Sequence, residues 1–540
     1  MAVLSNRTCF LMVISVTTIA SPIALGQGSI DIIAIEGQTA PDGNGMFSEF
    51  GQLQLNEKGE IAFSATLTGA DSPVTERGIF LGAVDSLTQV VRSGQASPDG
   101  NGRFFAFSTR PPPLNDAGHI VFVASLAGTL GGYKDSTGVF LAADGTLTQL
   151  AREGEAVPGI NGVFEGFTRS LPSINNADQV AFIADIDAPY PEPRLAVLLS
   201  TPDSLEVAVA SLAPVPLGDG VLSTFSEVKI NDLGEIAFRA RLVDGDYGLY
   251  HYADEQLNQV ARDGQPAPDG DGVIELRPND GYLFDNHGDF TVFAELLDTL
   301  DGVDDQAIFR TSNGSLMPIV RTGEPAADAD RWFYFLRQVT HNDLGQVAFS
   351  SVFGNLTGGA SFVEAILVAD EQGISEVITD DDTLGPDQIK DFKYFLSTND
   401  DGHLAFLVTF VFSGPGFEPG HPDHALMLKS QHGLTHIARP GDPLADSTIG
   451  RLVRIGTSPR DEIGQRAALN ARGQVAFAFL LEDGRQGIAL FTPVPEPSAS
   501  ALLLGAVISL AVGSRRRAAP TVLPQESQRD DAPDMGISPH

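Results

Sequence analysis

Cysteine is almost absent from this 540-residue chain. The single thiol belongs to Cys9, near the N-terminus, so the rest of the chain contains no cysteine. Disulfide bonds, thiolate metal sites and a thiol nucleophile are therefore excluded from the body of the protein. The chain also has no Gly-x-Ser-x-Gly, no His-Glu-x-x-His and no phosphate-binding loop, so no catalytic residues can be assigned from motifs.

Basic residues are scarce as well. The chain has 33 Lys and Arg against 70 Asp and Glu, which gives a formal charge of −37. A body this acidic repels phosphate backbones, and no stripe of Lys and Arg with interleaved aromatics reverses the charge locally, so we expect no nucleic-acid partner.

Aromatic residues with a polar tip are also few. There are 33 Phe but only 8 Tyr and 1 Trp. Because Tyr and Trp are the aromatics that suit interfaces, we expect most of the aromatic surface to lie in the core. Carbohydrate stacking has little support in the sequence beyond Trp332 and Tyr334.

Residues 1–26 have the pattern of a secretory signal peptide. Arg7 precedes an apolar run from Cys9 to Ala20, and the small residues Ala24-Leu25-Gly26 form a cleavage site. The apolar run is shorter than the roughly 20 residues that span a bilayer, which disfavours a retained anchor. We expect export, with a mature body over residues 27–493.

The other end of the chain carries three features in a fixed order. They are a Pro-Glu-Pro triplet, an uncharged apolar stretch and an arginine cluster: Pro495, Glu496, Pro497; residues 499–513; Arg515, Arg516, Arg517. This order resembles the PEP-CTERM sorting signal of Gram-negative envelope and exopolysaccharide systems. The resemblance implies that residues 494–517 are a sorting signal with a transmembrane helix, and that the arginines stay cytoplasmic.

By the same resemblance, an exosortase-type enzyme would cut near the triplet and release the body to the cell surface or the extracellular space. Until then the C-terminal helix would hold the protein in the inner membrane. The family's signal usually stops soon after the arginines, whereas here the polar residues 518–540 follow. We expect these residues to be a disordered cytoplasmic tail.

One phrase recurs eight times between residues 56 and 477, approximately Asn-x-x-Gly-x-x-Ala-Phe. Asn suits the first position of a type I turn and Gly the fourth. Two copies depart from the phrase, since Asp178 replaces the Gly of the third and Asp285 replaces the Asn of the fifth. Six copies keep Asn, Gly and Phe: Asn56, Gly59, Phe63; Asn115, Gly118, Phe122; Asn231, Gly234, Phe238; Asn342, Gly345, Phe349; Asn399, Gly402, Phe406; Asn470, Gly473, Phe477.

Each turn opens into a strand. After the first turn, Ile61, Phe63 and Ala65 fall at every second position, which is strand periodicity. Ala62, between two of them, is small in most copies, so we expect a neighbouring sheet to approach that face. Two further strands, a Gly/Pro loop and a Phe-rich strand complete the unit, and four strands per unit are typical of a propeller blade.

The sequence therefore predicts an all-β protein, a β-propeller of four-stranded blades. Eight blades follow from eight copies, and seven if the divergent fifth unit is not independent. The last unit ends at its third strand, Gly487–Phe491, and a strand near Ile30–Gly37 would supply the fourth and close the ring. An open solenoid is the alternative, and it would need polar caps.

The repeats also resemble the bacterial tandem family named for its NxxGxxAF repeat, whose members carry assorted C-terminal anchors including PEP-CTERM. The resemblance covers about Ile30 to Phe491. It implies a secreted repeat protein and brings no catalytic residues.

Features that recur in every unit are expected to be scaffold, because one active centre needs only one copy. We expect the arginines after the fourth strands to pair with carboxylates or carbonyls between blades, with an anion-binding ring as the alternative: Arg92, Arg152, Arg262, Arg321, Arg439. The Asp-Gly-Asn/Asp-Gly loops at residues 42–45, 99–102 and 269–272 resemble fragments of a calcium loop but lack its full pattern.

Unique loops carry more information about function. Insertions between second and third strands should gather on one rim, and such a rim is the usual binding surface of a repeat ring. Two of these loops contain candidate metal ligands, for Ca²⁺ or for a transition metal, with solvated loops as the alternative: Asp298, Asp301, Asp304, Asp305; His421, Asp423, His424.

We favour a non-enzymatic surface or matrix protein that binds through this rim or serves as a structural scaffold. Exopolysaccharide and surface proteins are the expected partner classes, and the ligand is not specified by the sequence. The alternative is a propeller hydrolase or lyase that acts on extracellular polysaccharide. The sequence specifies no cofactor, and Ca²⁺ is a candidate.

Overall fold

The three-dimensional structure is a computed structural model of the chain. It describes residues 24–25, 28–70, 76–108, 110–167, 170–218, 220–277, 281–300, 306–312, 314–326, 330–355, 362–384, 387–411, 424–431, 433–453 and 469–494. Apart from the short 3-10 turn η1 (Gly132–Asp135), these residues form strands and connections.

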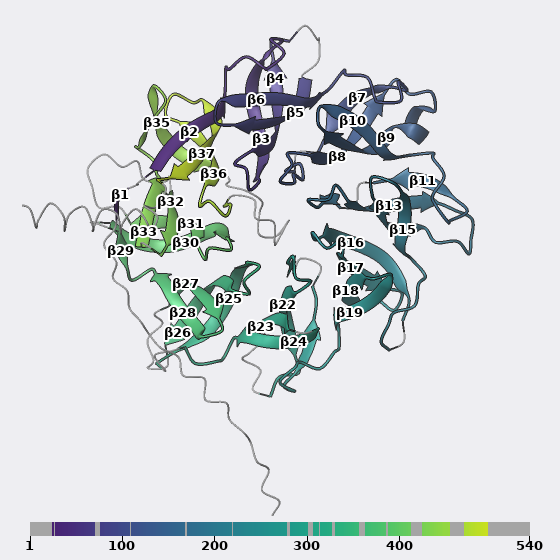
Figure 1. Cartoon of the computed structure of the whole chain (residues 1–540). Helices are drawn as coiled ribbons and strands as arrows, with labels where there is room; N and C mark the ends of the chain where they lie inside the picture. Colours follow the sequence, from purple (N-terminus) through teal and green to yellow (C-terminus); the bar gives the residue numbers. More distant parts are fainter. Residues whose placement is uncertain are drawn as a thin grey trace, which may run out of the picture. The chain divides into compact units, whose positions relative to one another are not determined.

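Eight antiparallel sheets follow one another around a ring (Figure 1). The first four blades are β3 (Met46–Leu55), β4 (Ile61–Thr68), β5 (Glu76–Ala83), β6 (Ser86–Arg92); β7 (Arg103–Phe107), β8 (Ile120–Ala127), β9 (Thr137–Ala143), β10 (Thr146–Arg152); β11 (Val163–Gly166) with β12 (Ser173–Ile174), β13 (Val180–Asp187), β14 (Leu195–Ser200), β15 (Leu205–Ala210); and β16 (Leu222–Ile230), β17 (Ile236–Leu242), β18 (Tyr247–Ala253), β19 (Gln256–Arg262).

The other four complete the ring. They are β20 (Val273–Glu275) with β21 (Tyr282–Phe284), β22 (Phe290–Leu297), β23 (Gln306–Ser312), β24 (Ser315–Arg321); β25 (Arg331–His341), β26 (Val347–Asn355), β27 (Val363–Asp370), β28 (Gly373–Thr379); β29 (Thr383–Leu384) with β30 (Asp387–Thr398), β31 (Leu404–Val411), β32 (His424–Ser430), β33 (Gly433–Ala438); and β34 (Pro443–Leu444) with β35 (Ser447–Val453), β36 (Val475–Leu481), β37 (Gln486–Pro493), β2 (Gly28–Ile35).

The predicted closure is confirmed. The N-terminal strand β2 pairs antiparallel with β37, so that Ile30 lies opposite Phe491 and Ile32 opposite Ala489. The fifth unit forms a sheet of its own, which makes the ring eight-bladed rather than seven-bladed. The chain is a closed propeller and not an open solenoid, because its first and last strands share one sheet.

The core explains the Ala-Phe pair of the repeat. In blade 1, Phe63 packs within its own sheet, with its ring centroid 5.8 Å from that of Phe80. Ala62, on the opposite face, is fully buried in a cluster with Phe104 and Phe122 of blade 2. Small residues on one face therefore let the next blade approach, as the sequence predicts.

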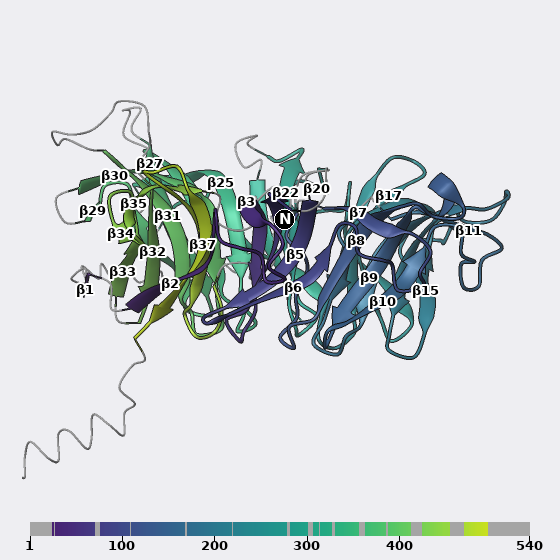
Figure 2. The same ribbon diagram turned by 90° about the horizontal axis from the view of Figure 1, so that it is seen from above.

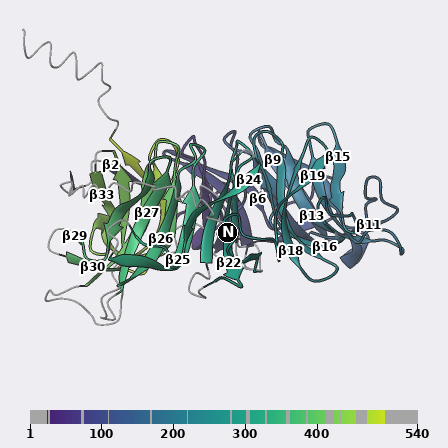
Figure 3. The ribbon, with the colours of Figure 1, turned by 90° about the horizontal axis from the view of Figure 1, so that it is seen from below.

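We call the first strand of each blade its inner strand. In Figure 1, the inner strands β3, β16 and β25 lie nearer the centre of the ring than β6, β19 and β28, the last strands of the same blades. Figures 2 and 3 view the ring from its edge, with strands running between its two flat faces. Each inner strand thus has a loop end, where it starts, and a turn end, where the Asn-x-x-Gly turn follows.

The predicted targeting segments lie almost wholly outside the described residues. Of the signal peptide, only β1 (Ala24–Leu25) is described, and it pairs in parallel with β33. The sorting signal beyond Val494 and the tail at 518–540 are not described. Within the described ranges, no helix is long and apolar enough to cross a membrane.

Candidate binding face

The turn end of each inner strand is built around the first residue of the repeat. In blade 1 the Oδ1 atom of buried Asn56 accepts hydrogen bonds from the N–H groups of Lys58 and Glu60, at 3.1 and 2.8 Å. Its Nδ2 donates to the backbone oxygen of Asn115 in blade 2, at 3.0 Å. One side chain therefore shapes its own turn and ties that turn to the next blade.

This inter-blade bond repeats around the molecule. The eight first turn residues, which we call the asparagine ring, are Asn56, Asn115, Asn175, Asn231, Asp285, Asn342, Asn399 and Asn470. Six further Nδ2-to-oxygen bonds join 115 to 175 (3.0 Å), 175 to 231 (2.9 Å), 231 to 285 (3.2 Å), 342 to 399 (2.8 Å), 399 to 470 (2.7 Å) and 470 to 56 (3.1 Å). The last of these bonds closes the ring.

Blade 5 uses an ion pair in place of the carboxamide. Asp285 has no Nδ2, and its carboxylate accepts from Arg310 at 3.1 Å. Burial raises the pKa of Asp285, and hydrogen bonds from two backbone N–H groups and the charge of Arg310 offset only part of that rise. The Arg310 guanidinium also lies against Gly345 of blade 6, where a Cβ atom would collide with it.

Two features of the turn end favour the repeated glycine. Gly59 has a φ of 87°, which disfavours any residue with a Cβ. A Cβ atom there would also lie 2.7 Å from Oε1 of Gln474 in the preceding blade. The turn face is therefore made of repeated residues that hold one another, and this assigns the repeat to scaffold.

The loop end of the inner strand has an irregularity that the sequence interpretation missed. In blade 1, Phe47 pairs with Leu67 and Glu49 pairs with Thr66, so Ser48 is an extra residue, a β-bulge. The same shift occurs in seven blades, and we call these extra residues the bulge ring: Ser48, Phe105, Glu165, Ser223, Tyr334, Lys390, Gly450. Blade 5 keeps a regular register.

The bulge leaves two consecutive residues without a place in the core. In blade 2, Phe104 and Phe107 are buried, whereas Phe105 between them is 63% exposed. The backbone feature is shared, but the side chains on it are not: the bulged residue is polar, acidic, basic, aromatic or glycine according to the blade. Such positions can vary without disturbing the packing of the blade.

A detectable signal for the bulges does exist in the sequence. Apolar residues in a strand normally recur at every second position. At the start of these strands they recur three apart instead, as in Phe104 and Phe107 or Phe333 and Leu336. This spacing marks an extra residue between two core positions.

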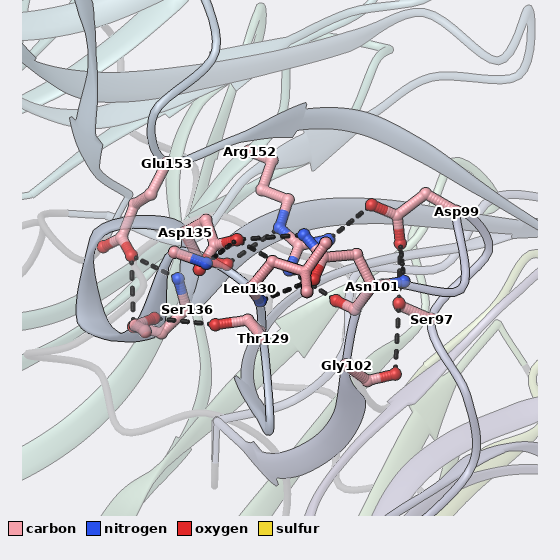
Figure 4. A network of polar contacts seen from close by, with 12 residues as sticks. Ser97, Asp99, Asn101, Gly102, Thr129, Leu130, Asp135, Ser136, Arg152 and Glu153 are labelled. Carbon is pink, nitrogen blue, oxygen red and sulfur yellow. Dashed lines mark hydrogen bonds and ion pairs between the residues drawn. The ribbon is translucent and has the colours of Figure 1, made fainter.

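The loops at the same end are fixed by ion pairs. In blade 2 the Arg152 guanidinium donates to the Asp99 carboxylate at 2.6 Å, to the backbone oxygen of Asn101 at 2.6 Å and to that of Asp135 at 2.8 Å (Figure 4). The Asn101 Oδ1 in turn accepts from the N–H of Leu130, whose side chain is 93% exposed. The network therefore holds the loop between second and third strands in one position.

The pKa of Asp99 reflects this network. Partial burial alone would raise the pKa, but hydrogen bonds from Ser97 and from the N–H of Asn101, together with the charge of Arg152, outweigh it and lower the pKa. Both carboxylate oxygens are thus already engaged by protein donors.

The other predicted arginines are paired in a similar way. Arg92 and Arg321 contact Asp42 and Asp269, which lie in the Asp-Gly loops that lead into their own blades. Arg262 contacts Asp244 and Asp246 at 3.1 and 3.0 Å, and Arg439 lies 4.0 Å from Asp442. The arginines of blades 1, 4 and 5 thus pair with carboxylates in loops of their own blade, and Arg439 pairs with a carboxylate in the connection that leads into blade 8.

The candidate metal ligands are only partly described. Asp298 is an exposed loop residue with a φ of 57°, and His424 Nδ1 lies 3.0 Å from the hydroxyl of Thr409. The remaining candidates lie outside the described residues: Asp301, Asp304, Asp305, His421, Asp423. Among the residues that are described, no group of three or more His, Cys, Asp or Glu side chains is placed to hold a metal ion.

The expectation that aromatic surface lies in the core is only partly right. Among the residues that the structure describes, most Phe side chains are buried, but six aromatic residues are strongly exposed: Phe105, Tyr133, Tyr190, Tyr334, Phe335, Phe362. All six lie on the loop-end halves of inner strands or in the loops between second and third strands. The loop face is therefore the candidate binding face.

The sequence of this chain matches a known protein family over the whole propeller. The model of a family of unknown function, DUF7453, matches three successive segments, residues 20–193, 189–398 and 388–501. The chain belongs to DUF7453. The DUF7453 matches span all eight blades, and no curated protein matches the chain.

Solved structures similar to this DUF7453 chain are distant. The β-propeller domain of the Trilobed protease from Pyrococcus furiosus is 11% identical, with a TM-score of 0.35 over 71% of this chain and 94% of that chain. An ulvan lyase of polysaccharide lyase family PL25 is 11% identical, with a TM-score of 0.31 over 83% and 95%. The Aleuria aurantia lectin is 9% identical, with a TM-score of 0.27 over 62% and 96%.

Proposed function

We propose that this protein is an exported, non-enzymatic binding scaffold of the cell surface or extracellular matrix, and that the bulge ring contacts its ligands. One observation carries the proposal: seven blades share a backbone bulge at the same place but carry different side chains on it. Bulges commonly re-aim side chains beside functional sites. A constant backbone with variable side chains is the arrangement that a binding surface needs.

The route to the surface is the second part of the proposal. The signal peptide over residues 1–26 would direct export, and the PEP-CTERM-like segment over residues 494–517 would hold the protein in the inner membrane until an exosortase-type enzyme cuts it. The mass of the mature protein from exosortase-positive and exosortase-negative cells tests this. We expect a C-terminus near Pro495–Pro497 only in the first, and identical full-length C-termini would contradict it.

Retention on extracellular material tests the binding role. The body, residues 27–493, is incubated with polysaccharide and surface-protein fractions from the producing bacterium. A bulge variant (Phe105→Ser, Tyr334→Ser, Phe335→Thr) is compared with a turn-face variant (Leu233→Asn, Leu344→Asn), whose leucines are 65% and 68% exposed. We expect only the bulge variant to lose retention, and loss in the turn-face variant alone would place binding on the wrong face.

A hydrolase or lyase acting on extracellular polysaccharide is the second candidate. Two exposed carboxylates on the loop-end halves of inner strands favour testing it, because such enzymes act through carboxylates: Glu165 of the bulge ring, and Glu49, which follows the bulged Ser48. Release of reducing ends or unsaturated products from polysaccharide would support catalysis. Its loss in Glu49→Gln or Glu165→Gln, with binding retained, would assign the role.

A further inference from the structure

Blade 6 has two consecutive exposed aromatic residues at its bulge, where blade 2 has one, Phe105, and the other bulged blades have small or charged residues. Its bulged residue is Tyr334, which is 49% exposed, and the next residue, Phe335, is 45% exposed. Phe362, at the start of β27, is 52% exposed, and its ring centroid lies 5.0 Å from that of Tyr334. Three large aromatic side chains are thus held in partial contact with solvent on one blade.

A fixed polar pair borders these rings. Phe335 pairs with Val352, and Val352 pairs with Glu364, so Glu364 lies in the same row across the sheet. Its Oε1 accepts from Arg337 at 2.7 Å, and its Oε2 accepts from the N–H of Phe392 in blade 7 at 3.3 Å. The Arg337 side chain is 42% exposed, so unused donors of its guanidinium remain open to a ligand.

This combination suits a sugar ring better than a purely apolar partner. A pyranose has a flat C–H face that can pack on an aromatic ring, and a rim of hydroxyl groups that pair with guanidinium and carboxylate groups. Ligand sites generally combine aromatic walls with a few placed polar groups. The formal charge of −37 disfavours an anionic polymer, which leaves neutral sugars.

We propose that Tyr334, Phe335 and Phe362, bordered by Arg337 and Glu364, form a subsite for a neutral saccharide. This proposal rests on the binding function proposed above and names its ligand class. The aromatic rings supply the stacking surface, and the ion pair orients the hydroxyl groups. The subsite belongs to blade 6, at its junction with blade 7.

The chain carries a natural reporter of this subsite. Trp332 is the single tryptophan of the sequence and stands two residues before Tyr334. Its ring packs over Gly354 on the paired strand, where a Cβ atom would come within 2.9 Å of Cε2. The indole is therefore fixed beside the aromatic surface, and its fluorescence should respond to a ligand there.

The test is a titration of the body with neutral oligosaccharides (cello-, laminari-, xylo- and mannohexaose), followed by tryptophan fluorescence and by calorimetry. The site variant is Tyr334→Ser with Phe335→Thr, which gives blade 6 the bulge residues of blade 4, Ser223 and Thr224. The matched control is Leu344→Asn, which removes an exposed apolar side chain from the turn end of the same blade. Circular dichroism of both variants checks that they fold.

We expect saturable binding of at least one neutral hexaose, an affinity at least about tenfold weaker in the site variant, and no change in the control. Equal binding by the site variant would overturn the assignment to blade 6. Binding of alginate or polygalacturonate in preference to every neutral hexaose would overturn the ligand class. Absence of saccharide binding, while the body still binds surface proteins through the bulge ring, would overturn this inference and leave the proposed function standing.

Discussion

The two ends of the inner strands differ in what is repeated from blade to blade. At the turn end, eight copies of nearly the same residues bond to one another around the ring. At the loop end, seven copies of the same bulge carry side chains that differ in size, charge and polarity. Repeated side chains therefore mark the part of this propeller that holds the ring together, whereas a repeated backbone with different side chains marks the face that we propose binds ligands.

The contrast is sharpest where the turn end itself departs from the repeat. At blade 5 an aspartate replaces the asparagine, and an arginine accompanies it. The substitution at Asp285 of the asparagine ring is thus accompanied by a charged partner, Arg310, and we expect substitutions in the bulge ring to need no such partner.

Arg310→Leu should be the most damaging change. The Asp285 side chain has no exposed surface, so loss of its cation leaves a buried carboxylate without an ionic partner. Breaking a buried pair in this way costs about 3–5 kcal/mol. A leucine side chain fits at position 310, because Leu81 occupies the equivalent position of blade 1. Chemical denaturation at pH 8 measures the loss.

Asp285→Asn combined with Arg310→Leu is the control, because it recreates the pairing of blade 1. Most of the lost stability should return. The pKa of Asp285 is raised by burial, and removal of Arg310 would raise it further. A carboxyl group with a raised folded pKa stabilises at low pH and loses that contribution as pH rises, so the single variant should lose less at pH 4 than at pH 8. Equal losses at both pH values would contradict this account.

Asn115→Ala should cost about 2–3 kcal/mol. The change removes bonds to the N–H groups of Ala117 and His119 and to the oxygen of Asn175, all of them within 3.0 Å. The exposed loop residue Asn161 provides the control, and Asn161→Ala should change the free energy of unfolding by less than about 0.5 kcal/mol. Similar values for the two variants would show that the ring does not lock the blades.

Gly59→Ala should cost about 1 kcal/mol more than Gly43→Ala. Both glycines have a positive φ, 87° and 79°, so both substitutions carry backbone strain. Only at Gly59 would the new methyl group also meet a neighbouring blade, since nothing lies within 4 Å at Gly43. Thermal unfolding of the two variants isolates that contact, and equal melting temperatures would argue against it.

Phe105→Ser should leave the free energy of unfolding within about 0.5 kcal/mol of the parent. Serine is already the bulged residue of blades 1 and 4, as Ser48 and Ser223. A loss above about 1.5 kcal/mol, measured by denaturant unfolding, would mean that bulge side chains support the fold and are not free to vary.

Calcium should have the smallest effect. The carboxylates of Asp42, Asp99 and Asp269 already pair with arginines, so they are less available to bind a cation. We expect no change in melting temperature at millimolar Ca²⁺ compared with EDTA. A saturable rise would point to a tight site.

The sequence predicts the fold well because each blade repeats the same turn and strand pattern. The turn residues need particular backbone angles, and the Ala-Phe pair distinguishes the two faces of the strand, so eight copies and one missing strand define the closed ring. The partner of Asp285 could not be predicted, because Arg310 lies on another strand and only the sheet register brings them together.

The bulge ring is hard to predict for a different reason. The second strands show regular alternation, whereas the first strands depart from it only by a three-residue spacing such as that of Phe104 and Phe107. Likewise, the count of Phe residues predicts a buried aromatic core, but it does not distinguish Phe104, which is 1% exposed, from its neighbour Phe105. The extra residue of the bulge places Phe104 and Phe107 in the core three positions apart and leaves Phe105 exposed between them.

Native-state hydrogen exchange across blade 2 tests the central comparison most directly. The amide of His119 donates to Asn115 Oδ1 at 2.9 Å and should exchange only when the whole ring unfolds. The amide of the bulged Phe105 should exchange by local opening, orders of magnitude faster. If peptides covering residues 114–120 exchange as fast as those covering residues 103–107, the division into a locked end and a variable end is wrong.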